Sequence, residues 1–321
     1  DKTVVQYICG NTSTGVDYRY LEAWASYAGF SLERETLPVA SLNTKRNLLV
    51  LGSTDIDKTS AKAIEDFINS GGNAVFYVSG NVIGIKSNWE ARQNRDNPLL
   101  GVLSRQGFTM LPGLLMDVLH SRITLPALDN SRYTEVEYPF WVTVPRQGFT
   151  PDEPVFSGLS KLQLFWPSAF LIDQTIFPNV KPLARATSRA RLMIVPYDTN
   201  PFGKQVSLLD ATDTERNGSI KAAGASVIAA KKKPGRIIVV ADEYMPSQFV
   251  DYTGSDGNLD FAVSCLEWTA GEDRLLELKE RKSPDNSRTL DSSGNENPKA
   301  ERLSNERNLY RARLVNLMIL P

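Results

Sequence analysis

Short apolar runs alternate with amphipathic segments over the first 110 residues. Residues 4–8, 47–52 and 74–78 are largely apolar runs that end at glycine or small polar residues, which is typical of strands buried on both faces. Residues 61–68 carry apolar side chains at helical spacing and predict a helix between two of these strands. Repeated β-α-β units imply a parallel sheet with right-handed crossovers. The pattern therefore predicts a doubly wound α/β core with a mostly parallel sheet.

Several polar residues stand where helices are expected to begin. Asn97 precedes Pro98 and an apolar face that Gly107 closes, so a helix is predicted to start after Asn97. Asp17 and Asn258 stand before two other apolar faces and are predicted to cap helices in the same way.

The pattern divides the chain into core, insertion and tail. Prolines are frequent and predicted strands are short between residues 112 and 210, which indicates a β- and loop-rich insertion. Residues 1–111 and 211–282 are predicted to form the two parts of the α/β core, the second beginning with a hairpin. Residues 283–300 have hardly any apolar side chain and are predicted to be a flexible linker.

Residues 301–321 combine a mixed-charge segment with an apolar run that follows Arg311 and Arg313. A basic flank before an apolar run is typical of the start of a membrane-spanning helix. We therefore expect a juxtamembrane helix leading into a truncated membrane anchor. The alternative interpretation is an amphipathic helix that docks on the domain.

Composition narrows the classes of partner. The 36 basic and 37 acidic residues give a formal net charge of −1, so no basic field attracts nucleic acid. The two cysteines, Cys9 and Cys265, lie far apart in apolar patterns and are too few for a metal cluster or a disulfide framework. Both are expected to be small buried side chains, and whether they pair is left open.

The sequence offers no complete catalytic motif. The single histidine, His120, lies in an apolar segment and is interpreted as structural, and one histidine excludes a metal site built from clustered imidazoles. Gly-x-Ser-x-Gly, its cysteine equivalent and Gly-x-x-x-x-Gly-Lys-[Ser/Thr] are all missing from the sequence. No catalytic residue, metal or cofactor is predicted.

Small polar residues and carboxylates follow the predicted buried strands. Open α/β sheets bind ligands outside the carboxyl ends of their strands, so these positions could line a crevice for a small polar ligand such as a sugar. They fit ordinary turns equally well. They are Gly10, Asn11, Thr12, Ser53, Thr54, Asp55, Ser79, Gly80, Asn81, Asp242 and Glu243.

An ordered set of phrases resembles the uncharacterised auxiliary family of ABC-type transport systems, which includes a gliding-motility accessory protein. The phrases are residues 47–53, 67–75, 96–100, 156–159, 234–242, 257–261 and 268–273. The resemblance covers residues 45–321, whereas residues 17–46 match poorly. It implies a glutamine-amidotransferase-like (flavodoxin-like) α/β fold, shared with an intraflagellar-transport relative. Catalytic enzymes of that fold carry a cysteine elbow that this sequence lacks, so the resemblance implies a non-catalytic version.

Three functional hypotheses follow. The first is a non-catalytic soluble domain of a membrane-anchored ABC auxiliary component, acting with a separate permease and ATPase on the extracytoplasmic (periplasmic) side. The alternative is a carbohydrate-binding or carbohydrate-active α/β protein, favoured by the polar strand ends and by Trp89, Trp141 and Trp166, which are expected to be exposed. The third is a scaffold that binds protein partners through residues 112–210.

Overall fold

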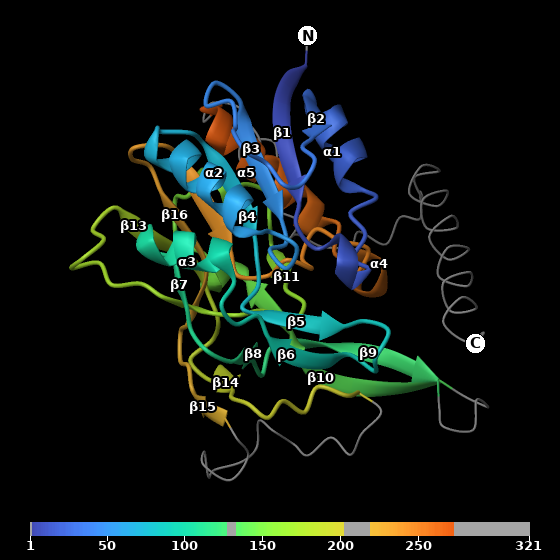
Figure 1. Ribbon diagram of the computed structural model, residues 1–321. Coiled ribbons are helices and arrows are strands. Elements are labelled where there is room, and N and C mark those ends of the chain that lie inside the picture. Colours follow the sequence, from blue (N-terminus) through green and yellow to red (C-terminus); the bar gives the residue numbers. More distant parts are fainter. Residues whose placement is uncertain (1, 127–132, 202–218, 273–321) are drawn as a thin grey trace.

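A nine-stranded sheet organises the fold (Figure 1). The computed structural model describes residues 2–126, 133–201 and 219–272. The sheet runs in the order β2 (Phe30–Arg34), β1 (Thr3–Cys9), β3 (Asn47–Leu51), β4 (Ala74–Tyr77), β17 (Ile237–Val240), β16 (Ser226–Lys231), β12 (Phe170–Leu171) and β7 (Thr109–Met110), with β13 (Val180–Arg185) also paired to β16. The strands from β2 to β17 are parallel, and β16 continues the sheet antiparallel to β17. The chain is therefore a mixed α/β protein.

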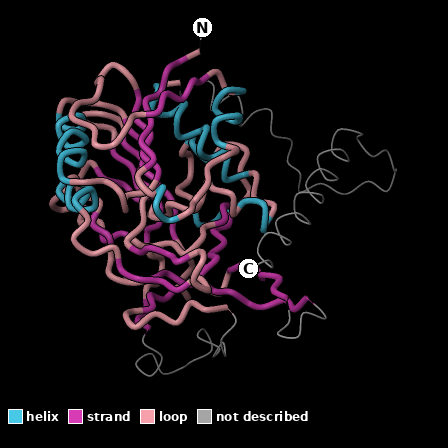
Figure 2. Tube along the Cα trace, turned by 45° about the vertical axis from the view of Figure 1, so that its right-hand side comes forward, coloured by secondary structure: helices cyan, strands magenta, loops and turns pink. Residues whose placement is uncertain are grey.

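Helices cover both faces of the parallel strands, as Figure 2 shows. The helices are α1 (Leu21–Tyr27), α2 (Lys58–Asn69), α3 (Pro98–Arg105), α4 (Val250–Thr253) and α5 (Gly257–Ala270). Leu21 of α1 and Phe261 of α5 share one apolar cluster, whereas Ile64 of α2 and Leu99 of α3 belong to another. Alternate residues of each strand point to opposite faces, so every residue of β3 is buried. The uninterrupted apolar runs of the sequence reflect this double burial.

The predicted capping residues have different outcomes. Asn97 does cap α3, because its side chain accepts hydrogen bonds from the backbone N–H groups of Leu99 and Leu100. Asp17 does not cap α1, because its carboxylate binds the backbone and guanidinium of Arg19. Asn258 lies inside α5, where its side chain binds backbone groups of other segments rather than its own helix. The two predictions were wrong for different reasons. Asp17 binds Arg19, a local partner two residues along the chain, whereas tertiary partners hold the side chain of Asn258.

Smaller sheets extend from one end of the large sheet (Figure 1). They comprise the hairpin β5 (Asn81–Gly84) with β6 (Glu90–Gln93), the sheet of β9 (His120–Pro126), β10 (Tyr133–Pro145) and β11 (Lys161–Gln163), and the sheet of β8 (Leu114–Met116), β14 (Arg191–Met193) and β15 (Ser219–Lys221). Three 3₁₀ turns lie at Thr12–Thr14, Arg146–Gly148 and Pro154–Phe156.

The segment predicted as an insertion, residues 112–210, contributes strands to both parts of the fold. It supplies β12 and β13 to the large sheet and β8–β11 and β14 to the smaller ones. Its division from the core at residues 111 and 210 stays a prediction. The linker at 283–300 and the juxtamembrane helix at 301–321 lie outside the described residues. Over the described part of the chain, no helix combines the length and the apolar character needed to cross a bilayer.

Candidate functional site

The loops that follow β1 and β17 are joined at the carboxyl ends of the parallel strands. The side-chain amide of Asn11 donates to Oε1 of Glu243 at 3.1 Å and to the hydroxyl of Tyr18 at 2.8 Å. Tyr18 in turn donates to the backbone carbonyl of Glu243 at 2.9 Å. Asn11 and Glu243 are fully buried. Two of the predicted crevice residues thus bind each other.

Two glycines allow the loops after β1 and β3 to pack closely. Gly52 has a φ of +78°, and a Cβ atom there would lie 2.2 Å from Cγ of Asn11. A Cβ atom at Gly10 would lie 2.6 Å from the carbonyl oxygen of Gly52. Only glycine provides both the left-handed backbone and the space. The sequence signal for this contact was a glycine directly after each buried strand.

Asp55, after β3, binds the loop after β1. Its Oδ2 accepts from the hydroxyl of Thr12 at 3.0 Å and from the backbone N–H of Ser13 at 2.9 Å, and its Oδ1 accepts from the hydroxyl of Ser13. The strand order changes direction between β1 and β3, which is the place where open α/β sheets usually hold a ligand. In this chain the Asp55 carboxylate accepts the hydrogen bonds of Thr12 and Ser13 at this place.

Asp242 and Glu243 follow β17 in the chain and are fully buried. Asp242 accepts from the backbone N–H groups of Phe165 at 2.6 Å and Tyr244 at 2.7 Å, and burial raises its pKa well above the ordinary range despite these donors. Burial raises the pKa of Glu243 to about 7, although the Asn11 amide opposes the shift. Among the described residues, neither Oε2 of Glu243 nor the hydroxyl of Thr54 has a hydrogen-bond partner. Glu243 is therefore a buried carboxyl group whose pKa lies well above its ordinary value.

The predicted residues after β4 also bind neighbouring loops. Asn81 donates to the carbonyl of Gly113 at 2.9 Å, and the backbone N–H of Gly80 donates to Ser168 at 2.9 Å. Asn94 links the loops after β3 and β4, because its amide donates to the Ser53 hydroxyl at 3.0 Å and to the carbonyl of Ser79 at 3.3 Å. Asn94 carried no signal in the sequence, since it follows a hairpin that pattern reasoning did not resolve.

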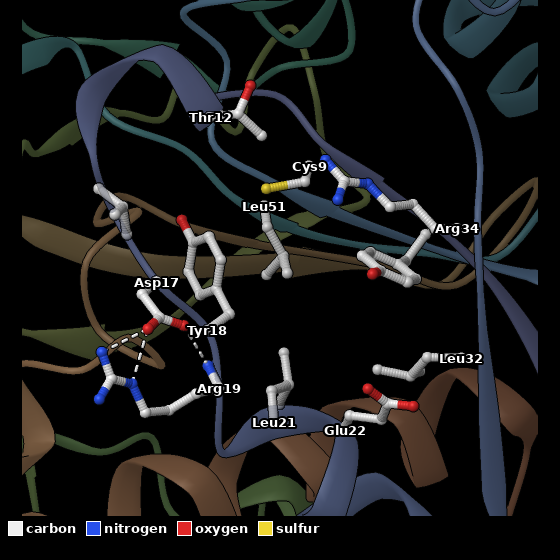
Figure 3. A pocket seen from close by; sticks show the side chains of 12 residues that line it. Cys9, Thr12, Asp17, Tyr18, Arg19, Leu21, Glu22, Leu32, Arg34 and Leu51 are labelled. Atoms are coloured by element: carbon white, nitrogen blue, oxygen red, sulfur yellow. Dashed lines mark hydrogen bonds and ion pairs between the residues drawn. The ribbon is translucent and has the colours of Figure 1, made fainter.

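A cavity of about 310 Å³ lies next to Tyr18, which forms part of its wall (Figure 3). Strand β1 supplies Tyr7 and Cys9 to its wall, β2 supplies Leu32 and Arg34, and residues 16–22 close it. Of the predicted crevice residues, Thr12 alone lines this cavity. Sequence reasoning missed the pocket because side chains of three strands, of α1 and of the loop before α1 build it together.

The candidate reactive groups are dispersed. Cys9 and Cys265 are both free thiols, and burial raises the pKa of each. His120 lies on β9, where Nε2 contacts a Glu137 carboxylate oxygen at 2.8 Å and Nδ1 contacts the Asp117 carbonyl at 2.9 Å. Within residues 2–126, 133–201 and 219–272, no three His, Cys, Asp or Glu side chains are grouped to hold a metal ion.

The expectation that three tryptophans are exposed is wrong. Trp89, Trp141 and Trp166 are 9%, 1% and 0% exposed. The ring of Trp89 stacks on Trp141 with a centroid distance of 5.4 Å and meets Trp166 edge-on at 5.2 Å. These rings form the apolar core beneath the smaller sheets together with Tyr138 and Phe249, so they offer no surface for stacking a ligand.

Comparison with known proteins identifies one family. Residues 2–265 match the family described as an ABC-type uncharacterized transport system. The match includes residues 17–46, where the resemblance of individual phrases to the family is poor. Comparison with curated proteins returns no match. Because the family match spans most of the 321 residues and every strand of the large sheet, the chain belongs to this ABC-type transport-system family.

Proposed function

We propose that this chain is the non-catalytic, water-facing domain of a membrane-anchored auxiliary component of an ABC-type transport system. It acts with a separate permease and a separate ATPase. Membership of the family supports the auxiliary role. A separate ATPase is needed because the sequence has no Gly-x-x-x-x-Gly-Lys-[Ser/Thr] loop to hold the phosphates of ATP.

The observation that carries the non-catalytic part is the mutual pairing of polar groups at the strand ends. Glu243 binds Asn11, and Asp55 binds Thr12 and Ser13. In open α/β enzymes, groups at these positions face a ligand. In this chain they hold neighbouring loops together, and the raised pKa of Cys9 keeps the nearest thiol protonated.

The finer fold assignment is part of the same proposal. The parallel strands follow the order β2-β1-β3-β4-β17, which corresponds to the flavodoxin-like order of doubly wound sheets. Helices lie on both faces of these strands. Both features support a doubly wound, glutamine-amidotransferase-like core without that fold's catalytic cysteine elbow.

The membrane anchor is proposed from the sequence, and the extracytoplasmic location is proposed from the resemblance to the family alone. An apolar run at residues 314–320 follows Arg311 and Arg313, and such a basic flank is typical of the start of a membrane-spanning segment. A carbohydrate-binding function has less support than the pattern alone offered, because the three tryptophans expected to stack on a sugar are buried.

Two experiments test the proposal. Affinity purification of the full-length, detergent-solubilised protein from its own cells, followed by mass spectrometry, should recover an ABC ATPase and a multi-span permease. Turnover assays on esters, glycosides and amides should give rates no higher than those of buffer. Robust hydrolysis that disappears in a variant of the strand-end cluster would contradict the non-catalytic assignment.

A further inference from the structure

Two acidic and two basic side chains line the cavity beside Tyr18, and one acidic side chain binds one of the basic side chains directly. Asp17 accepts from the backbone N–H of Arg19 at 2.8 Å and from its Nε at 2.6 Å (Figure 3). This pair neutralises itself at the rim. Arg34 and Glu22 are the other two charged residues of the wall, and their side chains make no hydrogen bond or ion pair within the part of the chain that the structure describes.

The two unpaired charges act on the same region of the cavity. Figure 3 shows the Arg34 guanidinium near the Cys9 thiol and the Glu22 carboxylate toward α1, below Leu32. Both charges act on the hydroxyl of Tyr7. Arg34 lowers the pKa of this hydroxyl and Glu22 raises it, while burial raises it most. A ligand in the cavity therefore meets both a cation and an anion on its wall.

The remaining wall combines the hydroxyl-bearing Tyr7, Thr12 and Tyr18 with apolar side chains. Leu21 and Leu51 are buried, and Leu32 is partly buried. The cavity of about 310 Å³ lies at the small end of ligand pockets, which span roughly 300–1,000 Å³. Its size suits a ligand with a few non-hydrogen atoms beyond its charged groups.

We propose that this cavity binds a small zwitterion, an α-amino acid or short peptide with an apolar side chain. Arg34 binds the carboxylate in a geometry that its guanidinium favours, Glu22 binds the ammonium group, and Leu21 and Leu32 contact the side chain. An uncharged sugar leaves both charges of the wall unpaired, and a simple carboxylate or amine leaves one. This inference goes beyond the transporter role and does not depend on it.

The test is isothermal titration calorimetry with the purified full chain and leucine as the probe. The two comparison ligands are 4-methylpentanoate, which lacks the ammonium group, and isopentylamine, which lacks the carboxylate. We expect leucine to bind and each comparison ligand to bind at least about tenfold more weakly, because each loses one charge-assisted contact. The dipeptide Leu-Leu separates the two sources: tighter binding than leucine identifies a peptide, and weaker binding identifies an amino acid.

Variants locate the binding in this cavity. Arg34→Gln and Glu22→Gln should each weaken leucine binding by about tenfold or more. Arg46→Gln and Glu33→Gln are matched controls, because these two residues pair with each other at 2.6 Å outside the cavity, and they should leave binding unchanged. Both cavity residues are exposed, so all four variants should fold with the thermal midpoint of the wild type.

Several results would overturn the proposal, in whole or in part. Absence of a binding heat with both leucine and Leu-Leu at millimolar concentration overturns the proposal, as does full binding by both cavity variants. Equal binding of leucine and 4-methylpentanoate overturns the zwitterion assignment. Since the chain is tested alone, a failure here is separate from a failure to recover a permease and an ATPase.

Discussion

The side-chain amide of Asn11 lies 3.1 Å from Oε1 of Glu243, although the two residues are 232 positions apart in the chain. This bond connects the loop after β1 to the loop after β17 across the carboxyl ends of the parallel strands. It places a buried carboxylate against an amide in the region where open α/β folds hold ligands. The account of a non-catalytic domain depends on this closed arrangement.

The buried carboxylate makes stability depend on pH. Glu243 has a pKa of about 7 in the folded chain against an ordinary value of 4.5, so the folded protein retains a proton that the unfolded chain releases between these values. The stability that the folded protein gains from binding this proton is fully present below pH 4.5 and is lost as the pH rises to 7. Glu243→Gln removes this titration. The stability of the variant relative to wild type should therefore increase by about 3 kcal/mol between pH 4.5 and pH 8.

Urea unfolding at both pH values measures this difference. Glu33→Gln provides the control, because Glu33 is an exposed carboxylate on β2 that pairs with Arg46. Its effect should stay within about 1 kcal/mol at either pH. A free-energy difference between Glu243→Gln and wild type that does not change with pH would contradict the buried, proton-binding Glu243.

Close packing of the strand-end loops predicts a difference between two glycine substitutions. Gly52→Ala places a Cβ atom 2.2 Å from Asn11, whereas Gly29→Ala meets nothing within 4 Å at a similar positive φ. We expect Gly29→Ala to destabilise the fold by about 1 kcal/mol from backbone strain alone. Gly52→Ala should cost about 2–3 kcal/mol more. Equal losses in chemical denaturation would show that the two loops do not touch.

The aromatic core beneath the smaller sheets depends on one buried hydroxyl. Tyr138 accepts a hydrogen bond from Nε1 of Trp166 at 2.8 Å and donates to the carbonyl of Thr199 at 2.7 Å. Tyr138→Phe leaves both partners unpaired and should destabilise the protein by about 1–3 kcal/mol. Tyr27→Phe, at a side chain that is 91% exposed, should change stability by less than about 0.5 kcal/mol. Thermal unfolding monitored by tryptophan fluorescence compares them.

Both thiols should react slowly in the folded protein. The thiolate is the reactive form, and burial raises the pKa of Cys9 and Cys265. Alkylation followed by mass spectrometry should modify Cys9 before Cys265, because Cys9 lines the cavity and Cys265 is fully buried. Both rates should rise with pH, and denaturant should make them equal. Detection of a disulfide between the two cysteines would contradict this arrangement, and so would equal alkylation rates without denaturant.

Pattern reasoning predicted the elements whose environment is local. Residues 47–52 became β3 because both faces of that strand are covered, and Asn97 caps α3 because its partners are two and three residues away. The hairpin of β16 and β17 follows equally from two adjacent apolar runs.

Features that depend on distant partners could not be predicted from the pattern. Asn258 binds Gln163 of β11, 95 residues away, instead of capping its helix. Asp17 is a different case, because a competing local contact with Arg19 holds its carboxylate. The tryptophans looked exposed because their neighbours come from β6, β10 and the segment after β17 rather than from one periodic element. The positions after the buried strands did come together, but as partners of one another.

The most direct test of the account is recovery of partners with the full-length protein from its own cells. Detergent-solubilised protein should copurify with an ABC ATPase and a multi-span permease, each enriched over a tagged, unrelated membrane protein prepared in parallel. The auxiliary role also requires that the ATPase and permease remain when Glu243→Gln replaces the wild type, since that residue holds the fold and not the partners. Recovery of the protein without either subunit would contradict the proposed role.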